Sequence, residues 1–215
     1  MAEDDRSGRG LEIAEPAAAP ANPLLAALER ARAALDRERA AAPALAAELL
    51  ALPAAAALER IGREARFQTW GLCELLLAES AGAATVDPGG TEAARLASLA
   101  LAGAEHLDPA RHAAAVVADL KARAWAALGE ARRRAADLAG AEEALRAAAA
   151  CLSRGTGDLL VEARLLEFEA AVRRGQGRQG EAAALLKLAA ARYRESGEAE
   201  HLQRVLAERE DILKR

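Results

Sequence analysis

The stretch AWAALGEARRRAADLAGAEEALRAAA (residues 124–149) decides the fold, because it places bulky and small side chains at helical spacing. Trp125 and Leu128 are one helical turn apart, so both can fill the space between two paired helices. Gly129 and Ala141 lack bulk, so the two helices can approach closely where they cross. The stretch therefore predicts a helical hairpin that buries its apolar side chains between two helices.

The second half of this stretch carries a small, a large and a small residue at fixed spacing, and the same pattern occurs in two other places. The three sets are Ala97, Leu101 and Ala104; Ala141, Leu145 and Ala148; and Ala182, Leu186 and Ala189. Their first members are separated by 44 and 41 residues. In the copy that starts at Leu166, Glu169 stands where a leucine is expected, and the neighbouring Phe168 can supply the bulk if the helix is slightly rotated.

The composition supports an all-α fold. Alanine, the best helix former, provides 63 of the 215 residues, whereas aromatic residues make up only 2%. This composition excludes an all-β sandwich or barrel, because strands favour β-branched and aromatic residues. The charge of −4, from 29 basic and 33 acidic residues, gives no general attraction to nucleic acid or to an anionic membrane.

Apolar periodicity and helix breakers predict the positions of the helices. The expected helices cover residues 24–40, 44–51, 54–80, 91–107, 111–136, 140–153, 159–175, 179–196 and 198–213. Pro43 is expected to interrupt the first apolar pattern, and residues 81–90 to form a loop. Gly140 is expected to mark a break between helices, and Asp158 can cap the helix that follows it.

Three regions are expected along the chain: a disordered, Ala/Pro-rich tail at 1–22, N-terminal helices at 23–62, and a helical repeat domain with a C-terminal capping helix at 63–215. The N-terminus lacks the pattern of a signal peptide. The longest apolar stretch contains a glutamate and two prolines, so we expect no membrane span. We therefore expect a cytoplasmic protein.

The recurring slots over about residues 64–196 resemble the tetratricopeptide repeat (TPR). That family has a large residue, Leu and Gly on the first helix of each unit, and a small, a large and a small residue on the second. The spacings of 44 and 41 residues are longer than the usual period of about 34. The resemblance implies antiparallel helix pairs stacked as a short right-handed solenoid, with the first helices lining a concave, peptide-binding surface. An ordinary helical bundle is the alternative.

The resemblance also implies which side chains line that surface. Carried over residue by residue, they are Arg123, Ala126, Glu130, Arg133, Arg164, Glu167, Ala171 and Arg174. A surface with four arginines would suit an acidic peptide or a carboxylate, because the guanidinium group binds carboxylates in a bidentate manner. The alternative is that these charges are simply solvated. The clamp that some TPR domains use on acidic C-terminal peptides needs Lys and Asn, where this chain has Ala126 and Glu130.

The sequence predicts no catalytic, cofactor or metal site. GQGRQG (175–180) matches GxGxxG, but a charged helix precedes it, whereas a dinucleotide site requires a strand there. His106 and His112 are separated by the helix breaker Pro109, so they do not share a helix face. Cys73 and Cys151 form no CxxC pair and are expected to be buried as small apolar residues.

These patterns predict a non-enzymatic scaffold that binds a peptide or a partner protein through a concave helical surface, with neither nucleic acid nor membrane as partner. A regulatory or sensory subunit of a bacterial signalling or transcription-control complex is the alternative. In that case the tail and the helices at 24–61 would contact another component. A third hypothesis is that the chain is an enzyme of unfamiliar type.

Overall fold

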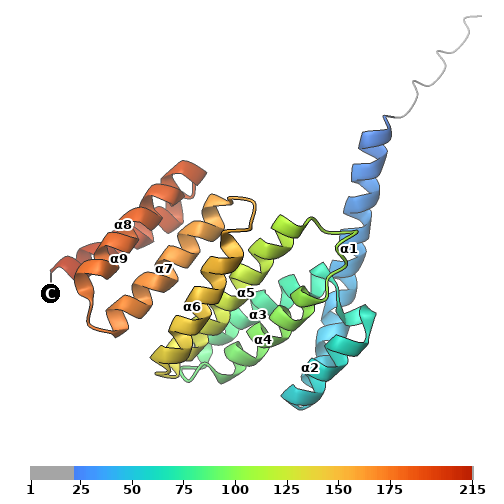
Figure 1. Ribbon diagram of the computed structural model, residues 1–215, viewed down its shortest axis with the longest axis horizontal. Coiled ribbons are helices and arrows are strands. Elements are labelled where there is room, and N and C mark those ends of the chain that lie inside the picture. Colours follow the sequence, from blue (N-terminus) through green and yellow to red (C-terminus); the bar gives the residue numbers. More distant parts are fainter. Residues whose placement is uncertain (1–21, 215) are drawn as a thin grey trace, which may run out of the picture. The chain divides into compact units, whose positions relative to one another are not determined.

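The computed structural model describes residues 22–214, and all regular structure in this range is helical (Figure 1). The elements are α1 (Pro23–Leu50), α2 (Ala54–Arg63), η1 (Ala65–Phe67, a 3₁₀ turn), α3 (Trp70–Val86), α4 (Thr91–Glu105), α5 (Ala114–Arg134), α6 (Leu138–Leu152), α7 (Leu159–Gly175), α8 (Gln179–Ser196) and α9 (Ala199–Leu213). The predicted all-α class is confirmed for this range. Apart from residue 22, the predicted tail lies outside the described residues.

Contacts divide the chain into two units after Ala34. The first unit is described only from residue 22 to Ala34, which includes the beginning of α1. In the second unit, α3 packs on α4, α5 on α6, α7 on α8, and α9 on α8. In addition, α5 contacts α3 and α7, so helices that are two apart in chain order are also neighbours. Within 22–214 no helix combines the length and the apolar character needed to cross a bilayer.

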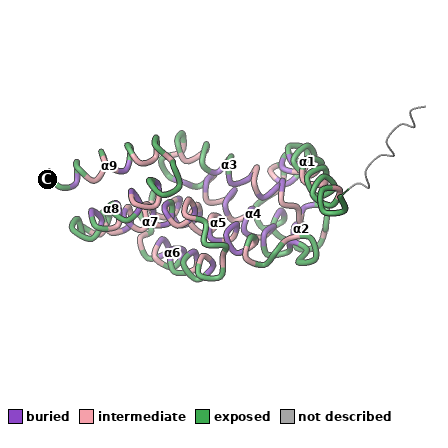
Figure 2. The backbone as a smooth tube through the Cα atoms, turned by 90° about the horizontal axis from the view of Figure 1, so that it is seen from above, coloured by how far each residue is buried: buried purple, intermediate pink, exposed green. Residues whose placement is uncertain are grey.

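The core of the second unit consists mainly of leucine and alanine side chains on the faces where helices meet. In Figure 2, buried and exposed segments alternate along the helices, as expected for helices with one packed face. All nine residues of the three small–large–small sets are buried. Gly129 is buried too, and a Cβ atom there would lie only 2.9 Å from Cβ of Ala144 and would overlap the ring of Phe168. The expected close approach at Gly129 is therefore confirmed, and Phe168 supplies the bulk beside it.

The predicted interruption at Pro43 is wrong, because α1 continues through it. A proline inside a helix removes one backbone hydrogen bond and crowds the preceding turn. Alanines surround Pro43, and they favour the helix strongly. Beyond the proline, Ala46 and Leu49 are buried, so tertiary packing holds the helix together past the break that the sequence suggested.

The single helix expected at 54–80 is also wrong, since α2, η1 and α3 occupy this range. The Thr69 hydroxyl accepts a hydrogen bond from the Leu72 N–H at 3.4 Å, and the Glu38 carboxylate accepts one from the Trp70 N–H at 2.9 Å. A Cβ atom on Gly71 would lie 2.6 Å from the backbone nitrogen of Arg39. The start of α3 therefore packs directly against the backbone of α1. The break between α2 and α3 allows α3 to begin at this place.

Two expected breaks lie a few residues away from their predicted places. Helix α3 extends to Val86, so only residues 87–90 of the predicted 81–90 loop form the turn. Gly140 lies inside the first turn of α6, where its N–H donates to the Asp137 carboxylate at 2.8 Å. The break itself lies at residues 135–137. The cap predicted at Asp158 is confirmed, because its carboxylate accepts a hydrogen bond from the Leu160 N–H at 2.8 Å.

Three turns in the C-terminal half share one backbone geometry. Ala136, Gly177 and Gly197 have φ values of 60°, 77° and 78°, in the left-handed region. In each case the next residue donates its N–H to the carbonyl five residues earlier, at 2.9 Å: Asp137 to Arg132, Arg178 to Arg173, and Glu198 to Tyr193. This is the hydrogen bond of a Schellman helix end, which glycine adopts most easily. Ala136 adopts it without being glycine.

Candidate functional site

Most of the side chains expected on a shared surface do lie around one hollow. Seven of the eight line it: Ala126, Glu130, Arg133, Arg164, Glu167, Ala171 and Arg174. The hollow has a volume of about 450 Å³. Helices α5 and α7 supply these residues, and they face the same side because they recur every three or four positions.

Helix α9 contributes a third wall, which the sequence analysis missed. His201, Arg204 and Glu208 line the same hollow, and they recur at three- and four-residue intervals along one face of α9. This spacing is visible in the sequence, but the sequence analysis predicts only a capping helix for this segment. The surface is therefore formed by three helices rather than by the first helices of two units.

Two predicted arginines on this surface already have carboxylate partners. Glu130 forms hydrogen bonds with Arg133 at 2.7 Å and with Arg134 at 3.1 Å, and Arg174 pairs with Glu208 at 2.8 Å. Burial opposes ionisation of Glu130, but the hydrogen bonds from the two arginines outweigh it and hold its pKa below the usual value. These pairs fix the arginine side chains and neutralise much of their charge.

Glu167 occupies the centre of a second polar cluster in the hollow. It accepts two hydrogen bonds from Arg204, at 2.6 and 3.0 Å, and one from the hydroxyl of Tyr193. The Tyr193 side chain is completely buried. Burial raises the pKa of Tyr193 well above its usual value, and the hydrogen bond to Glu167 adds to this shift. Glu167 therefore links α7 to both α8 and α9.

Arg123, the remaining predicted residue, lies in an adjoining hollow of about 410 Å³ together with Arg164. The two hollows share Ala126, Arg164 and His201, so they are continuous. Burial lowers the pKa of Arg123, and the positive charge of nearby Arg164 lowers it further. Neither arginine makes an ion pair or a hydrogen bond with another residue of the described range 22–214.

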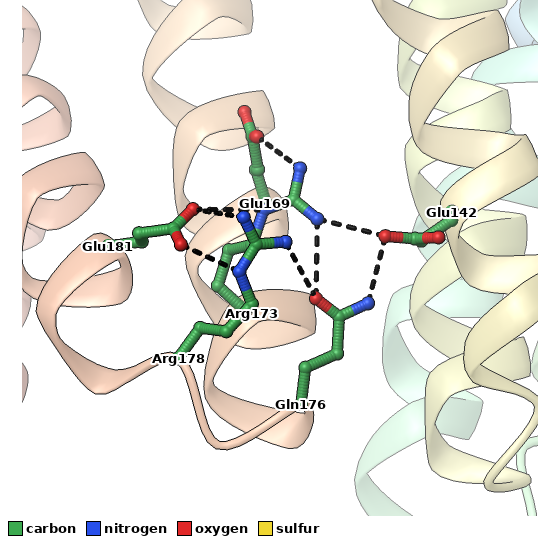
Figure 3. Close-up of polar contacts among 6 residues, drawn as sticks. All are labelled: Glu142, Glu169, Arg173, Gln176, Arg178 and Glu181. Atoms are coloured by element: carbon green, nitrogen blue, oxygen red, sulfur yellow. Dashed lines mark hydrogen bonds and ion pairs between the residues drawn. The ribbon is translucent and has the colours of Figure 1, made fainter.

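The glycine-rich stretch 175–180 spans the turn between α7 and α8, and Gln176 and Arg178 from this stretch belong to a network around Arg173 (Figure 3). Arg173 donates to Glu142 of α6 and to Glu169 of α7, both at 2.9 Å. Gln176 also donates to Glu142, at 2.8 Å, and Arg178 pairs with Glu181 at 2.6 Å. In this structure the stretch ties α6, α7 and α8 together.

The other residues considered for chemistry have structural contacts. A ring nitrogen of His106 lies 2.9 Å from the carbonyl oxygen of Ala102, and the ring of His112 stacks on Trp70 with centroids 5.5 Å apart. Both cysteines are buried and free, and burial raises the pKa of Cys73 to about 12. Among residues 22–214 no group of three or more His, Cys, Asp or Glu side chains is placed to hold a metal ion.

Comparison with known proteins gave no match: no protein-family model matches the chain, and no curated protein and no solved structure is significantly similar to it.

Proposed function

We propose that the chain is a non-enzymatic interaction scaffold that binds a peptide or a partner protein through the hollow between α5, α7 and α9. One observation carries this proposal: side chains from three helices, spread from Ala126 to Glu208, gather around a single hollow. The paired charges around it keep their side chains in place, so much of the surface is ordered before a partner arrives. Such preorganisation lowers the entropy lost on binding.

The chemistry of the hollow also suits a protein partner. Phe168 is buried, and Ala126 and Ala171 are half-buried, whereas Arg164 and Arg174 are exposed. The hollow therefore combines sheltered apolar groups with exposed charges. Protein interfaces commonly have an apolar centre surrounded by a polar rim.

For the architecture we propose TPR-like helix pairs in a right-handed solenoid, with α5–α6 and α7–α8 as successive units. Ala136 and Gly177 have the same backbone conformation in the turns of these pairs and are 41 residues apart. This equals the spacing of the buried Ala141 and Ala182. An experimental structure in which the two pairs fail to superimpose, or stack with the opposite hand, would contradict this architecture.

Site-specific photocrosslinking tests the proposed binding surface. A photoreactive amino acid at Ala171, which lines the hollow, should form a covalent adduct with the partner in an extract of the source cells. The matched control is the same group at Ala150, which is exposed on α6 and does not line the hollow. Adducts of equal yield from both positions, or none from Ala171, would overturn the proposal.

The beginning of α1 favours a second candidate function, that of a regulatory or sensory subunit. Leu24, Leu25 and Leu28 are 67%, 55% and 59% exposed, which is high for three neighbouring leucines. Such a segment suits contact with another component of a complex. Replacing Leu24 and Leu28 by Gln should abolish co-purification of that component without changing the thermal midpoint; unchanged co-purification would exclude this role for α1.

A further inference from the structure

The arginines around the two continuous hollows fall into two classes. Arg133, Arg174 and Arg204 each hold a carboxylate of this chain at 2.6 to 2.8 Å. An incoming anion would compete with that carboxylate for the same guanidinium group. Arg123 and Arg164 have no such competitor among the described residues. The capacity to bind an anion is therefore concentrated at one end of the surface.

The two carboxylates that act on Arg123 electrostatically are already engaged elsewhere. Glu74 and Asp158 are close enough to influence it electrostatically. Glu74 pairs with Arg39 at 2.9 Å, and Asp158 accepts the Leu160 N–H at the start of α7. Arg123 is half-buried and lies near the like charge of Arg164, so the two cations repel each other. A bound anion would relieve this repulsion.

Most of the other residues that line the hollow shared by Arg123 and Arg164 are apolar. The other residues that line their hollow are Leu77, Ala81, Ala122, Ala126, Ala127, Val161, Leu165 and His201. The aliphatic side chains of α3, α5 and α7 thus adjoin two cations that have no ion-pair partner within residues 22–214. The charges of an ion pair formed here are less screened than in open water. An apolar group of the same ligand can be buried beside that ion pair.

From this arrangement we propose that Arg123 and Arg164 anchor a partner peptide by binding an Asp or Glu side chain that is adjacent to an aliphatic or aromatic residue. The carboxylate lies between the two guanidinium groups, and the apolar side chain enters the hollow next to Leu77 and Val161. The proposal rests on the proposed function and assigns the recognition to the Arg123 end of the surface. Arg133 and Arg174 then organise the surface without contacting the acidic group.

Selection from a displayed library tests this anchor. The probe is a library of random seven-residue peptides with constant residues on both sides, so that only side chains supply carboxylates. The full chain should enrich peptides with Asp or Glu beside Leu, Ile or Phe. The double variant Arg123→Gln/Arg164→Gln should lose this preference and bind a selected acidic peptide about tenfold more weakly or worse, as measured by fluorescence anisotropy.

The matched control is Arg133→Gln/Arg174→Gln, which removes the same charge from the paired end of the surface. It should weaken binding of the same peptide less than Arg123→Gln/Arg164→Gln does, because Arg133 and Arg174 organise the surface without contacting the acidic group. Circular dichroism and the thermal midpoint establish that both double variants are folded. The single variant Arg164→Gln provides a milder test, since Arg164 is exposed and its loss leaves the core intact.

The outcomes separate this inference from the proposed function. Selected peptides without an acidic preference, or a larger loss in Arg133→Gln/Arg174→Gln, would overturn the anchor and leave a peptide-binding scaffold in place. If the full chain enriches no peptide, both proposals fail. Changing the acidic residue of the selected peptide to its amide should weaken binding to the full chain but not to Arg123→Gln/Arg164→Gln, and an equal loss with both proteins would also overturn the anchor.

Discussion

The helix pairs α5–α6 and α7–α8 have the same turn geometry but different interiors. In the first pair, the missing side chain at Gly129 makes room for the ring of Phe168 from the following pair. In the second pair, α7–α8, the Tyr193 side chain is buried and its hydroxyl donates a hydrogen bond to Glu167. Close steric packing thus accompanies this turn geometry in the first pair, and a hydrogen bond from a buried side chain accompanies it in the second. Local packing chemistry can therefore vary while the turn and the helix spacing stay the same.

The largest expected effect comes from Trp125, which contacts three apolar clusters although it is only partly buried. Trp125→Ala should lower the free energy of unfolding by about 3 kcal/mol, because it removes a large aromatic side chain shared by several helices. Leu166→Ala, 41 residues later, should lower it by about 2 kcal/mol. Urea unfolding followed by circular dichroism measures both values, and equal losses would show that the two positions are equally embedded.

The close approach at Gly129 should be sensitive to a single methyl group. Gly129→Ala should destabilise the fold by about 1–2 kcal/mol, because overpacking against Phe168 and Ala144 exceeds the gain in helix propensity. The control is Gly180→Ala in α8, where a Cβ atom would meet nothing within 4 Å. This control should be neutral or slightly stabilising in the same denaturation assay. A neutral Gly129→Ala would mean that the helices are not in contact there.

Tyr193→Phe probes the polar interior of the second pair and should lower stability by about 1 kcal/mol, because Glu167 loses one donor but keeps Arg204. The raised pKa of Tyr193 also predicts a pH dependence. The stability that Tyr193 contributes is fully present below about pH 10, the pKa of tyrosine in the unfolded chain. This stability is lost as the pH rises from there towards the raised pKa of the folded protein, because only the unfolded chain ionises readily.

Stability should therefore fall less steeply above pH 10 in Tyr193→Phe than in the unchanged protein. Tyr193 is the only tyrosine of the chain, so tyrosinate absorbance reports this group alone. An ordinary titration near pH 10 in the folded protein would contradict the buried hydroxyl. The thermal midpoint of both proteins, measured between pH 8 and 11, gives the stability difference directly.

The smallest effects are expected at the two matched turn positions. Ala136→Gly should stabilise the fold by about 0.5 kcal/mol, because glycine adopts a positive φ without strain although it loses more entropy on folding. Gly177→Ala should destabilise it by about 1 kcal/mol for the opposite reason. Thermal unfolding of both variants measures the difference. The same sign of change at both positions would show that the two turns do not share one conformation.

Local signals in the sequence were sufficient for the helical class and for most helices after Thr91. The Asp158 cap and the burial of Ala97, Ala141 and Ala182 followed from spacing and side-chain size alone. The errors cluster before Thr91, around Pro43 and at 54–80. There, packing between separate segments decides where helices continue or stop: Ala46 and Leu49 are buried beyond Pro43, and Gly71 lies against backbone that is 32 residues earlier in the chain. No local pattern contains that information.

For the candidate surface, the sequence by itself determined which faces of α5 and α7 carry charge, because helical periodicity fixes which residues point the same way. Only the tertiary structure decided that α9 forms the third wall and that Arg174 pairs with Glu208, whereas Arg123 and Arg164 have no ion-pair partner among the described residues. The physical reason is distance: an ion pair depends on a separation of about 3 Å between atoms. Between residues far apart in the chain, that separation is set by how the helices pack.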